Sequence, residues 1–403
     1  MGNMAAAQPA EPSRRQAFWL VISGFFGIGL VFGSWQVMMA DLQSAFGLSP
    51  GQLGLVLTVG VVGSFPSMLL SGRLADRWGA RRLIMGATLL TALAYGSYAW
   101  IGGTVWLVLT TLCLMGASGA MDVAINAAAV NYEQNTGDKK MSFFHAGYSG
   151  MAGTAAMTTG FLLFSGVNFR DIYWLVAVSL LLLTVLFWRA KAFDPLISHP
   201  APGQETPTPA GGKRFDLFRT PAILLLALIT TLTFFSEGTL ELWSAVYLRL
   251  SLDLPTLIGA AGPAVFHFAM MTGRLGSGWI LLHVHRRLML RVAGVLAAIG
   301  IGLSVSTVYP PVILFGFLLA GLALAGVVPI VFSLAGDIAP QRAGEVISVI
   351  TILGYAGFML GPALIGGLAD MFGLRMALMA LGVAGAGIVL MSFWVRHPAL
   401  DRK

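Results

Sequence analysis

The chain has 403 residues, of which 57% are hydrophobic and only 10% are charged, and its formal net charge is +7. Soluble globular proteins average about 25% charged residues, so this composition excludes that class of protein. A basic excess can indicate a nucleic-acid partner. Here the basic residues lie in short segments between apolar runs, where membrane topology accounts for them, and we expect no nucleic acid among the partners.

The apolar residues form twelve long runs. About twenty consecutive apolar residues cross a bilayer as a helix, so each run predicts one transmembrane span. The predicted spans are residues 17–40, 52–71, 83–102, 105–130, 142–166, 171–190, 221–248, 256–282, 288–306, 311–336, 345–369 and 375–395. The sequence therefore predicts an all-α membrane protein with twelve transmembrane helices in two six-helix halves.

The beginning of the chain resembles an export signal, because Arg14 and Arg15 precede an apolar stretch. The run 17–40 is too long for a cleaved signal and further runs follow it, which predicts an uncleaved first helix. We expect residues 1–16 to form a disordered cytoplasmic N-terminus and residues 396–403 to form a cytoplasmic tail.

The positions of the basic residues predict the orientation in the membrane. Of the 24 Lys and Arg residues, all but Arg170, Arg249 and Arg375 lie on the side of the predicted bundle that carries both termini. Loops rich in Lys and Arg stay in the cytoplasm. The prediction is a multi-pass protein of the cell inner (plasma) membrane with both termini cytoplasmic.

Residues 192–220 contain five prolines and three glycines, which predicts an exposed cytoplasmic linker. This linker separates an N-terminal bundle, residues 17–191, from a C-terminal bundle, residues 221–395. A short repeat supports the division, because Gly72-Arg73-Leu74 ends the second run and Gly273-Arg274-Leu275 ends the eighth. Two parallel halves with the substrate site between them are a standard transporter architecture.

A polar loop after the second run combines glycines with one acid and several arginines. Its members are Gly72, Asp76, Arg77, Gly79, Arg81 and Arg82. The loop resembles the signature loop of the major facilitator superfamily. The resemblance implies a conformational latch, in which Asp76 and the basic cluster pair with a neighbouring helix end when the cytoplasmic side is closed. The alternative is a basic loop that only fixes orientation. No acid follows Gly273 at the equivalent place, so the expected latch is asymmetric.

Few polar side chains lie inside the predicted spans, where a charged group costs about 2.5–3.5 kcal/mol at the midplane. Asp122 and Asn126 share a helix face, as do His145 and Tyr148. The seventh run carries a polar stripe of Thr230, Thr233, Glu237, Glu241 and Ser244. Because a stripe of this kind cannot face lipid, it is expected to face the interior of the bundle.

These side chains admit two interpretations. They either pair between helices as structural hydrogen-bond partners, worth about 0.6 kcal/mol each, or line a water-filled cavity that binds a polar solute and carries protons. The predicted substrate-binding residues are Gln36, Asp122, Asn126, His145, Tyr148, Glu237, Trp243 and His267. The predicted proton-coupling residues are Asp122, Glu237 and Glu241.

The segment from Gly119 to Asn126 resembles the fourth-helix motif of fucose-permease-like transporters, and blocks around His145 and Glu237 are similar to the YbjJ-type members of that branch. The resemblance implies that the acid and the amide of this motif, Asp122 and Asn126, line a sugar cavity. One departure is Gln36, which stands where fucose permease has a proton-linked Asp. An amide cannot titrate, so any proton coupling falls to Asp122 or to the glutamates of the seventh run, and fucose itself fits less well.

The sequence thus predicts a secondary active transporter that moves a small polar solute, a sugar or sugar-like compound, by proton-coupled alternating access. The alternative is a proton-driven exporter of drug-like or amphipathic compounds. The fifth run lacks the Gly-Pro signature of drug antiporters, which favours uptake. The chain has no nucleotide-binding loop and no paired catalytic constellation, so we expect no cofactor, no metal and no enzyme activity. Its single cysteine, Cys113, excludes an intrachain disulfide, and we expect a monomer.

Overall fold

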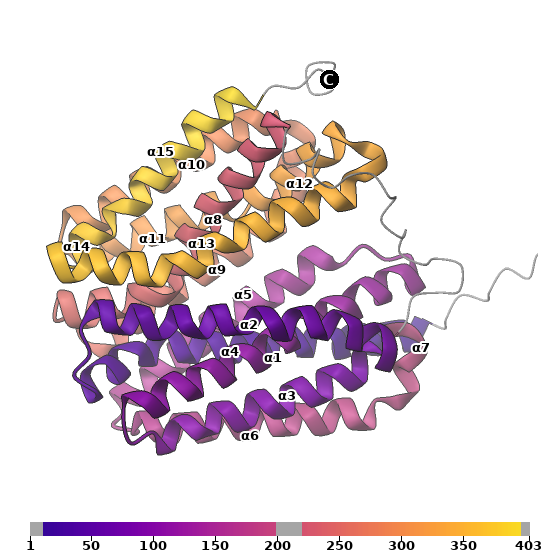
Figure 1. Cartoon of the computed structure of the whole chain (residues 1–403), viewed down its shortest axis with the longest axis horizontal. Coiled ribbons are helices and arrows are strands. Elements are labelled where there is room, and N and C mark those ends of the chain that lie inside the picture. The colour runs from indigo at the N-terminus through magenta and orange to yellow at the C-terminus, as the bar shows by residue number, and fades with distance from the viewer. Residues whose placement is uncertain (1–10, 199–219, 396–403) are drawn as a thin grey trace, which may run out of the picture.

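The computed structural model describes residues 11–198 and 220–395, and this part of the chain is helical with short connections (Figure 1). The long helices are α1 (Glu11–Ala45), α2 (Pro50–Trp78), α3 (Ala80–Ser97), α4 (Thr104–Thr136), α5 (Met141–Phe164), α6 (Phe169–Arg189), α8 (Pro221–Val246), α9 (Thr256–His283), α10 (Arg286–Ser306), α11 (Pro310–Leu324), α12 (Val327–Ile338), α13 (Ala343–Phe372) and α15 (Met379–Trp394). The short ones are α7 (Asp194–Ile197) and α14 (Leu374–Ala377), and a π-helical turn, Tyr247–Ser251, extends α8.

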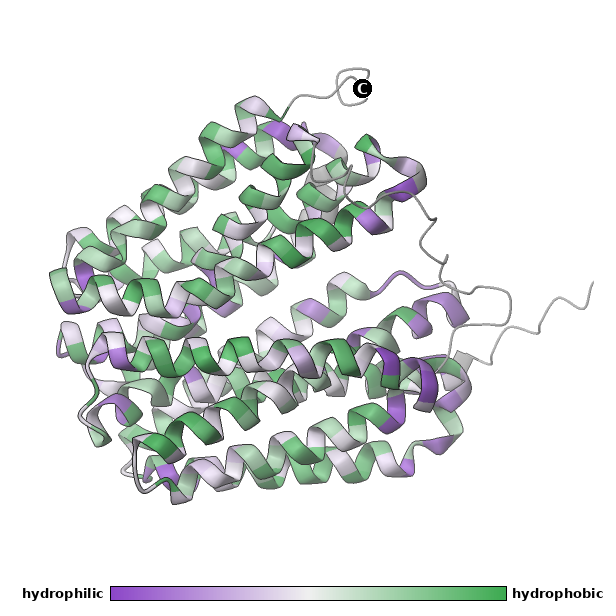
Figure 2. Cartoon of the chain, in the orientation of Figure 1, coloured by the Kyte–Doolittle hydropathy of each residue, from purple (hydrophilic) through white to green (hydrophobic). Residues whose placement is uncertain are grey.

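Helices α1 to α6 lie together in the lower part of Figure 1, and α8 to α15 lie in the upper part. Two pairs of helices join the two groups: α5 packs against α9, and α2 packs against α13. Figure 2 shows hydrophobic residues along most of the helix lengths, with hydrophilic residues gathered near the helix ends by α7. Large apolar side chains such as Leu69 and Val383 are exposed on the outside, as expected for a surface that faces lipid.

Eleven helical segments in the described residues are long and apolar enough to cross a membrane, one fewer than expected. The helix that is missing from this set is α5, which forms where residues 142–166 predict a span. It carries many Gly, Ser and Thr residues, and it packs between α1 and α9. A Cβ at Gly33 of α1 would collide with the carbonyl of Ala152, so the small residues of α5 serve close helix packing.

Two expectations about the chain ends and the linker need correction. Residues 11–16, expected to be disordered, form the first turns of α1, since each added residue extends the helix by one hydrogen bond without needing apolar surface. Residues 1–10 and 396–403 lie outside the described residues. The first part of the expected exposed linker is also structured, because Leu196, Ile197 and Ser198 are buried.

The segment α7 is held against the first group of helices by polar contacts. Arg81 Nε and Nη2 donate to the two carboxylate oxygens of Asp194 at 2.6 and 3.1 Å, and Arg81 Nη1 donates to the Phe187 carbonyl at 2.9 Å. Asn131 Nδ2 donates to the Ile197 carbonyl at 3.1 Å. Arg81 is therefore buried within one group of helices and does not join the two groups in this conformation, and its gating role stays a prediction.

The Asp194 carboxylate gives this contact a pH dependence. Partial burial by itself acts to raise the pKa of Asp194, but hydrogen bonds from Arg81 and Ser198 and the Arg81 charge outweigh it and lower the pKa. A lowered pKa stabilises the docked segment above the ordinary aspartate value of about 4. This stability is lost as the pH falls through the lowered value, when the carboxylate becomes protonated.

We expect Arg81→Ala to release α7. The pair is partly exposed to solvent, so the loss is about 1 kcal/mol, or roughly fivefold faster opening. Hydrogen exchange of the amides of residues 194–198 at neutral pH measures it. The control is Arg77→Ala, an exposed arginine of the same loop whose charge does not act on Asp194, and it should leave exchange unchanged. Equal exchange in both variants would show that the ion pair does not hold α7.

Candidate functional site

A central cavity of about 720 Å³ lies between the two groups of helices. Among the residues that line it are Asp122, Asn126, His145, Tyr148, Glu237, Glu241 and Arg274. A smaller adjoining cavity of about 210 Å³ shares Asp122, Tyr148 and Glu241 and adds Gln36. The structure thus brings six of the predicted polar residues, from α4, α5 and α8, into one cavity, and a seventh, Gln36 of α1, beside it.

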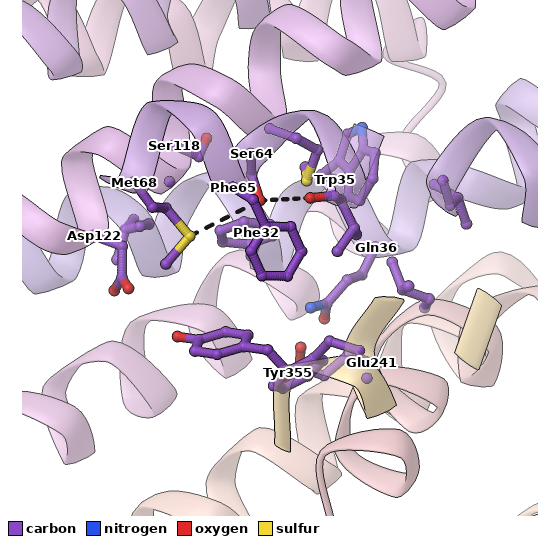
Figure 3. A pocket seen from close by; sticks show the side chains of 18 of the residues that line it. Phe32, Trp35, Gln36, Ser64, Phe65, Met68, Ser118, Asp122, Glu241 and Tyr355 are labelled. Carbon is purple, nitrogen blue, oxygen red and sulfur yellow. Dashed lines mark hydrogen bonds between the residues drawn. The ribbon is translucent and has the colours of Figure 1, made fainter. Parts of the chain in front are cut away.

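Figure 3 shows the smaller cavity, with Asp122 and Glu241 on opposite sides of the view and the rings of Phe32 and Phe65 between them. Asp122 is held by its own helix, since Asn126 Nδ2 donates to the Asp122 carbonyl at 2.9 Å and to its Oδ1 at 3.1 Å. The spacing of one helical turn that singled out this pair in the sequence therefore reflects a direct contact.

Gln36 and His267 form a hydrogen bond between α1 and α9, with Gln36 Oε1 and His267 Nε2 at 2.9 Å. Both side chains are at most 1% exposed. His267 lines neither cavity, so it orients Gln36 instead of reaching the space itself. Gln36 Nε2 has no hydrogen-bond partner in the described residues. An unpaired buried donor of this kind costs about 1–3 kcal/mol, which a bound oxygen would recover.

Trp243, another predicted substrate-binding residue, lies away from both cavities. It is completely buried in the apolar core. The aromatic wall of the larger cavity is built instead by Phe234, Tyr355 and Phe358, whose rings are 4.7 to 6.1 Å apart. The sequence hardly predicts this wall, because Tyr355 and Phe358 lie among the apolar residues of α13 and cannot be distinguished there from residues that pack between helices.

Arg274 is a cavity residue that the sequence analysis treated only as part of a repeat. Its Nη1 donates to Ser149 Oγ at 2.7 Å and to the His145 carbonyl at 3.4 Å, both on α5 of the other group. Its Nη2 lies 3.8 Å from Glu237 Oε2. The available signal was its position inside the predicted span 256–282, where an arginine is costly unless it lines a polar space.

At one end of the molecule an ion pair joins the two groups of helices. Arg249, in the π-helical turn after α8, donates to Asp41 Oδ2 at 2.5 Å and to Asp41 Oδ1 at 2.9 Å. The same guanidinium reaches the Val37 carbonyl at 3.3 Å. The two side chains are only 15% and 17% exposed. We call the end of the molecule that carries Asp41, Arg249, Ser49 and Asp370 the latch end.

A second contact at the latch end joins α13 to the beginning of α2. Asp370 accepts from Ser49 Oγ at 2.9 Å and from the Gly51 N–H at 3.0 Å. Ser49 is the N-cap of α2, so the carboxylate lies against the positive end of that helix. The helices approach closely here, and a Cβ at Gly366 would collide with the Pro50 carbonyl.

The predicted gating loop lies at the opposite end, where α2 ends at Trp78 and α3 begins at Ala80. Gly79 joins the two helices with a φ of +82°, a conformation that favours glycine. Asp76 and Arg77 are exposed, and Asp76 makes no hydrogen bond or ion pair with the described residues. The larger cavity reaches toward this end, since Met141 and Ser142 at the start of α5 line it.

Comparison with known proteins agrees with this architecture. A profile of the Major Facilitator Superfamily matches residues 18–362 and, in a second match, residues 284–403. An uncharacterised MFS-type transporter of Yersinia pestis is 29% identical over 355 residues, covering 88% of this chain and 89% of the relative. The membrane protein MosC of Rhizobium meliloti is 27% identical over 389 residues, covering 96% of this chain and 92% of that protein.

Solved structures show the same fold at low identity. A bacterial homologue of the human lysosomal transporter Spinster, inward-facing and unoccupied, has a TM-score of 0.78 and 16% identity, covering 96% of this chain and 99% of the other. The nucleoside transporter NupG has a TM-score of 0.77 and 12% identity, covering 94% and 98%. With a cavity between two groups of helices and a profile match over most of its length, the chain belongs to the Major Facilitator Superfamily.

Proposed function

We propose that this protein is a secondary active transporter that takes up a small polar solute, a sugar or sugar-like compound, by proton-coupled alternating access. The observation that carries the proposal is the convergence of Asp122, Glu237 and Glu241 on one cavity between the two groups of helices. An acid in such a space can bind a proton together with the solute and release both on the other side. Asn126 and Tyr148 add groups that hydrogen-bond hydroxyls.

In this proposal the protein has twelve spans in two six-helix halves, with α5 as the fifth, and lies in the inner membrane with both termini cytoplasmic. The positive-inside rule supports the orientation, because the loop with Arg77 and Arg82 is strongly basic. The latch end is then extracytoplasmic. The conformation described above, with the latch end closed by Arg249 and Asp41, is one in which the cavity faces the cytoplasm.

A proton-driven exporter of amphipathic compounds is the second candidate. The observation that favours it is the aromatic wall of Phe234, Tyr355 and Phe358, which suits an apolar ring. A related Escherichia coli protein, 25% identical over 414 residues, is named as a 3-(3-hydroxy-phenyl)propionate transporter, so relatives of this chain include one with an aromatic substrate. An aromatic wall also packs against the apolar face of a sugar ring, so the wall fits both candidates. The three acids of the cavity favour a polar solute and therefore support the first candidate.

The test follows external pH in lightly buffered, de-energised cells while sugars, polyols and sugar acids are added singly. We expect alkalinisation with one class of compound and at least a tenfold slower response in Asp122→Asn, because the neutral amide cannot carry the proton. The control is Asp171→Asn, which removes an exposed acid outside the cavity. A response that survives Asp122→Asn would reject the coupling role, and a silent panel with extrusion of drug-like compounds would favour the exporter.

A further inference from the structure

The acids of the cavity outnumber its cationic groups. Arg274 is the only Lys or Arg among the described residues that line either cavity, and it lies beside Glu237 at 3.8 Å. Asp122 accepts a hydrogen bond only from the neutral Asn126, and Glu241 makes no hydrogen bond or ion pair with the described residues. Two carboxyl groups therefore face the space without a cationic partner of their own.

The smaller cavity also holds unpaired groups that can bind oxygen. Gln36 Nε2 and Ser118 Oγ are buried and have no hydrogen-bond partner in the described residues. Both residues line the same space as Asp122 and Glu241, and Ser118 lies one helical turn before Asp122 on α4 (Figure 3). The single oxygen of the Gln36 amide is already bound to His267 Nε2, which leaves its N–H₂ group to donate into the cavity.

We infer that the solute is a hydroxylated amine, an amino sugar or amino polyol, whose ammonium group binds beside Asp122 and Glu241. Its hydroxyl oxygens accept from Gln36 Nε2 and pair with Ser118 Oγ. This inference rests on the proposed function and names its substrate class. An ammonium group supplies an ion-pair partner for these two half-buried carboxylates, whereas a carboxylate on the solute is repelled by the same groups.

The aromatic residues near the two acids fit the same solute. Tyr355 and Phe358 line both cavities together with Asp122 and Glu241. The face of an aromatic ring attracts an ammonium group, and it also packs against the C–H face of a sugar ring. These rings have no net charge, so they do not offset the excess of carboxylates.

The first experiment measures the charge preference of the cavity without a substrate. In a Cys113→Ser background, Val123→Cys places one thiol in the lining of the larger cavity. Its reaction rate is measured with a trimethylammonium methanethiosulfonate and with the sulfonate analogue, each corrected for the reagent's rate with a free thiol. We expect the cationic reagent to react at least about tenfold faster, as a charged cleft raises the local concentration of the opposite charge.

The preference should shrink in Glu241→Gln and stay unchanged in Asp171→Asn, which serves as the matched loss of an exposed acid. Equal or faster reaction of the anionic reagent in the parent protein would overturn the inference while leaving the proposed transport function untouched. A preference that is the same in all three proteins would also overturn it, because the charge would then come from elsewhere.

The second experiment compares glucosamine, glucose and glucuronate, which share one type of ring and carry a positive, no and a negative charge. Each compound is added to proteoliposomes preloaded with the same compound, and its exchange across the membrane is followed. We expect glucosamine to exchange fastest, and Glu241→Gln to reduce its advantage over glucose at least fivefold. Faster exchange of glucose or glucuronate would refute the charge assignment but keep the proposed function. Absence of exchange with all three, in protein that shows the reagent preference, would count against the proposed function instead.

Discussion

Replacing Arg249 with alanine is expected to open the latch end of the protein. The guanidinium holds both carboxylate oxygens of Asp41 and also the Val37 carbonyl, so its removal breaks every one of these contacts. Removing one partner of a fully buried ion pair costs about 3–5 kcal/mol. This pair is partly exposed, so we expect about 2 kcal/mol, which shifts the balance between conformations roughly 30-fold.

The measurement is the rate at which a membrane-impermeant maleimide, added from outside, labels Val61→Cys in a Cys113→Ser background. Val61 lines the smaller cavity, behind the latch. We expect labelling at least tenfold faster in Arg249→Ala. The matched control is Arg375→Ala, since Arg375 is basic and bonds the Val305 carbonyl within its own group of helices. The exchanged pair, Asp41→Arg with Arg249→Asp, should restore slow labelling, and failure to do so would assign the effect to local packing.

The long apolar helices followed from the sequence because length and hydropathy are local properties. All but one of the predicted spans qualify by those measures, and the exception, α5, departs for a physical reason. Its small and polar residues pack against α1 and α9. Whether a helix faces lipid or other helices depends on its neighbours in space, and these neighbours come from distant parts of the sequence.

The cavity residues on α4, α5 and α8 could also be predicted, since a polar group in an apolar span needs a polar space. Trp243 and His267 line neither cavity, which shows the limit of that reasoning, and their roles in binding stay predictions. A buried polar side chain can instead pair with another side chain, as His267 does with Gln36, and sequence gives no means to choose between a cavity and a partner 231 positions away.

The two residues of the ion pair at the latch end are also far apart in the sequence. Asp41 and Arg249 are 208 positions apart, and nothing near either residue indicates the other. The sequence does indicate that Arg249 makes a specific contact. It is among the few basic residues on the side of the bundle opposite the termini, where basic residues are rare. Arg81 shows the converse, since its neighbours resemble a gate while its partner, Asp194, lies in a segment expected to be an exposed linker.

The sequence also contains a repeat that the structure makes intelligible. Leu74-Ala75-Asp76 at the end of α2 recurs as Leu368-Ala369-Asp370 at the end of α13, and each is followed three residues later by a glycine, Gly79 or Gly373. Both glycines have the same left-handed φ, +82° and +81°. The two helix ends are thus equivalent structures that lie at opposite ends of the cavity.

This equivalence predicts the partner of Asp76. Asp370 at the end of α13 binds the N–H of Gly51, the second residue of α2. The second residue of α13 is Gly344, and a Glu follows it where Gln52 follows Gly51. When the end that carries Asp76 closes, we therefore expect the Asp76 carboxylate to bind the Gly344 N–H at the beginning of α13, as Asp370 binds the Gly51 N–H at the beginning of α2.

The consequence is that two chemically identical substitutions should act in opposite directions. In the proposed orientation, Asp370→Asn weakens the latch end and should speed outside labelling of Val61→Cys, whereas Asp76→Asn weakens closure of the opposite end and should slow it. A hydrogen bond to a charged group contributes about 1.5–3 kcal/mol, reduced here to about 1 kcal/mol by solvent. The two opposite effects together amount to about 2 kcal/mol, so the two variants should differ roughly 30-fold in labelling rate. Changes in the same direction would show that Asp76 does not close the end opposite the latch end, since only a role opposite to that of Asp370 reverses the sign.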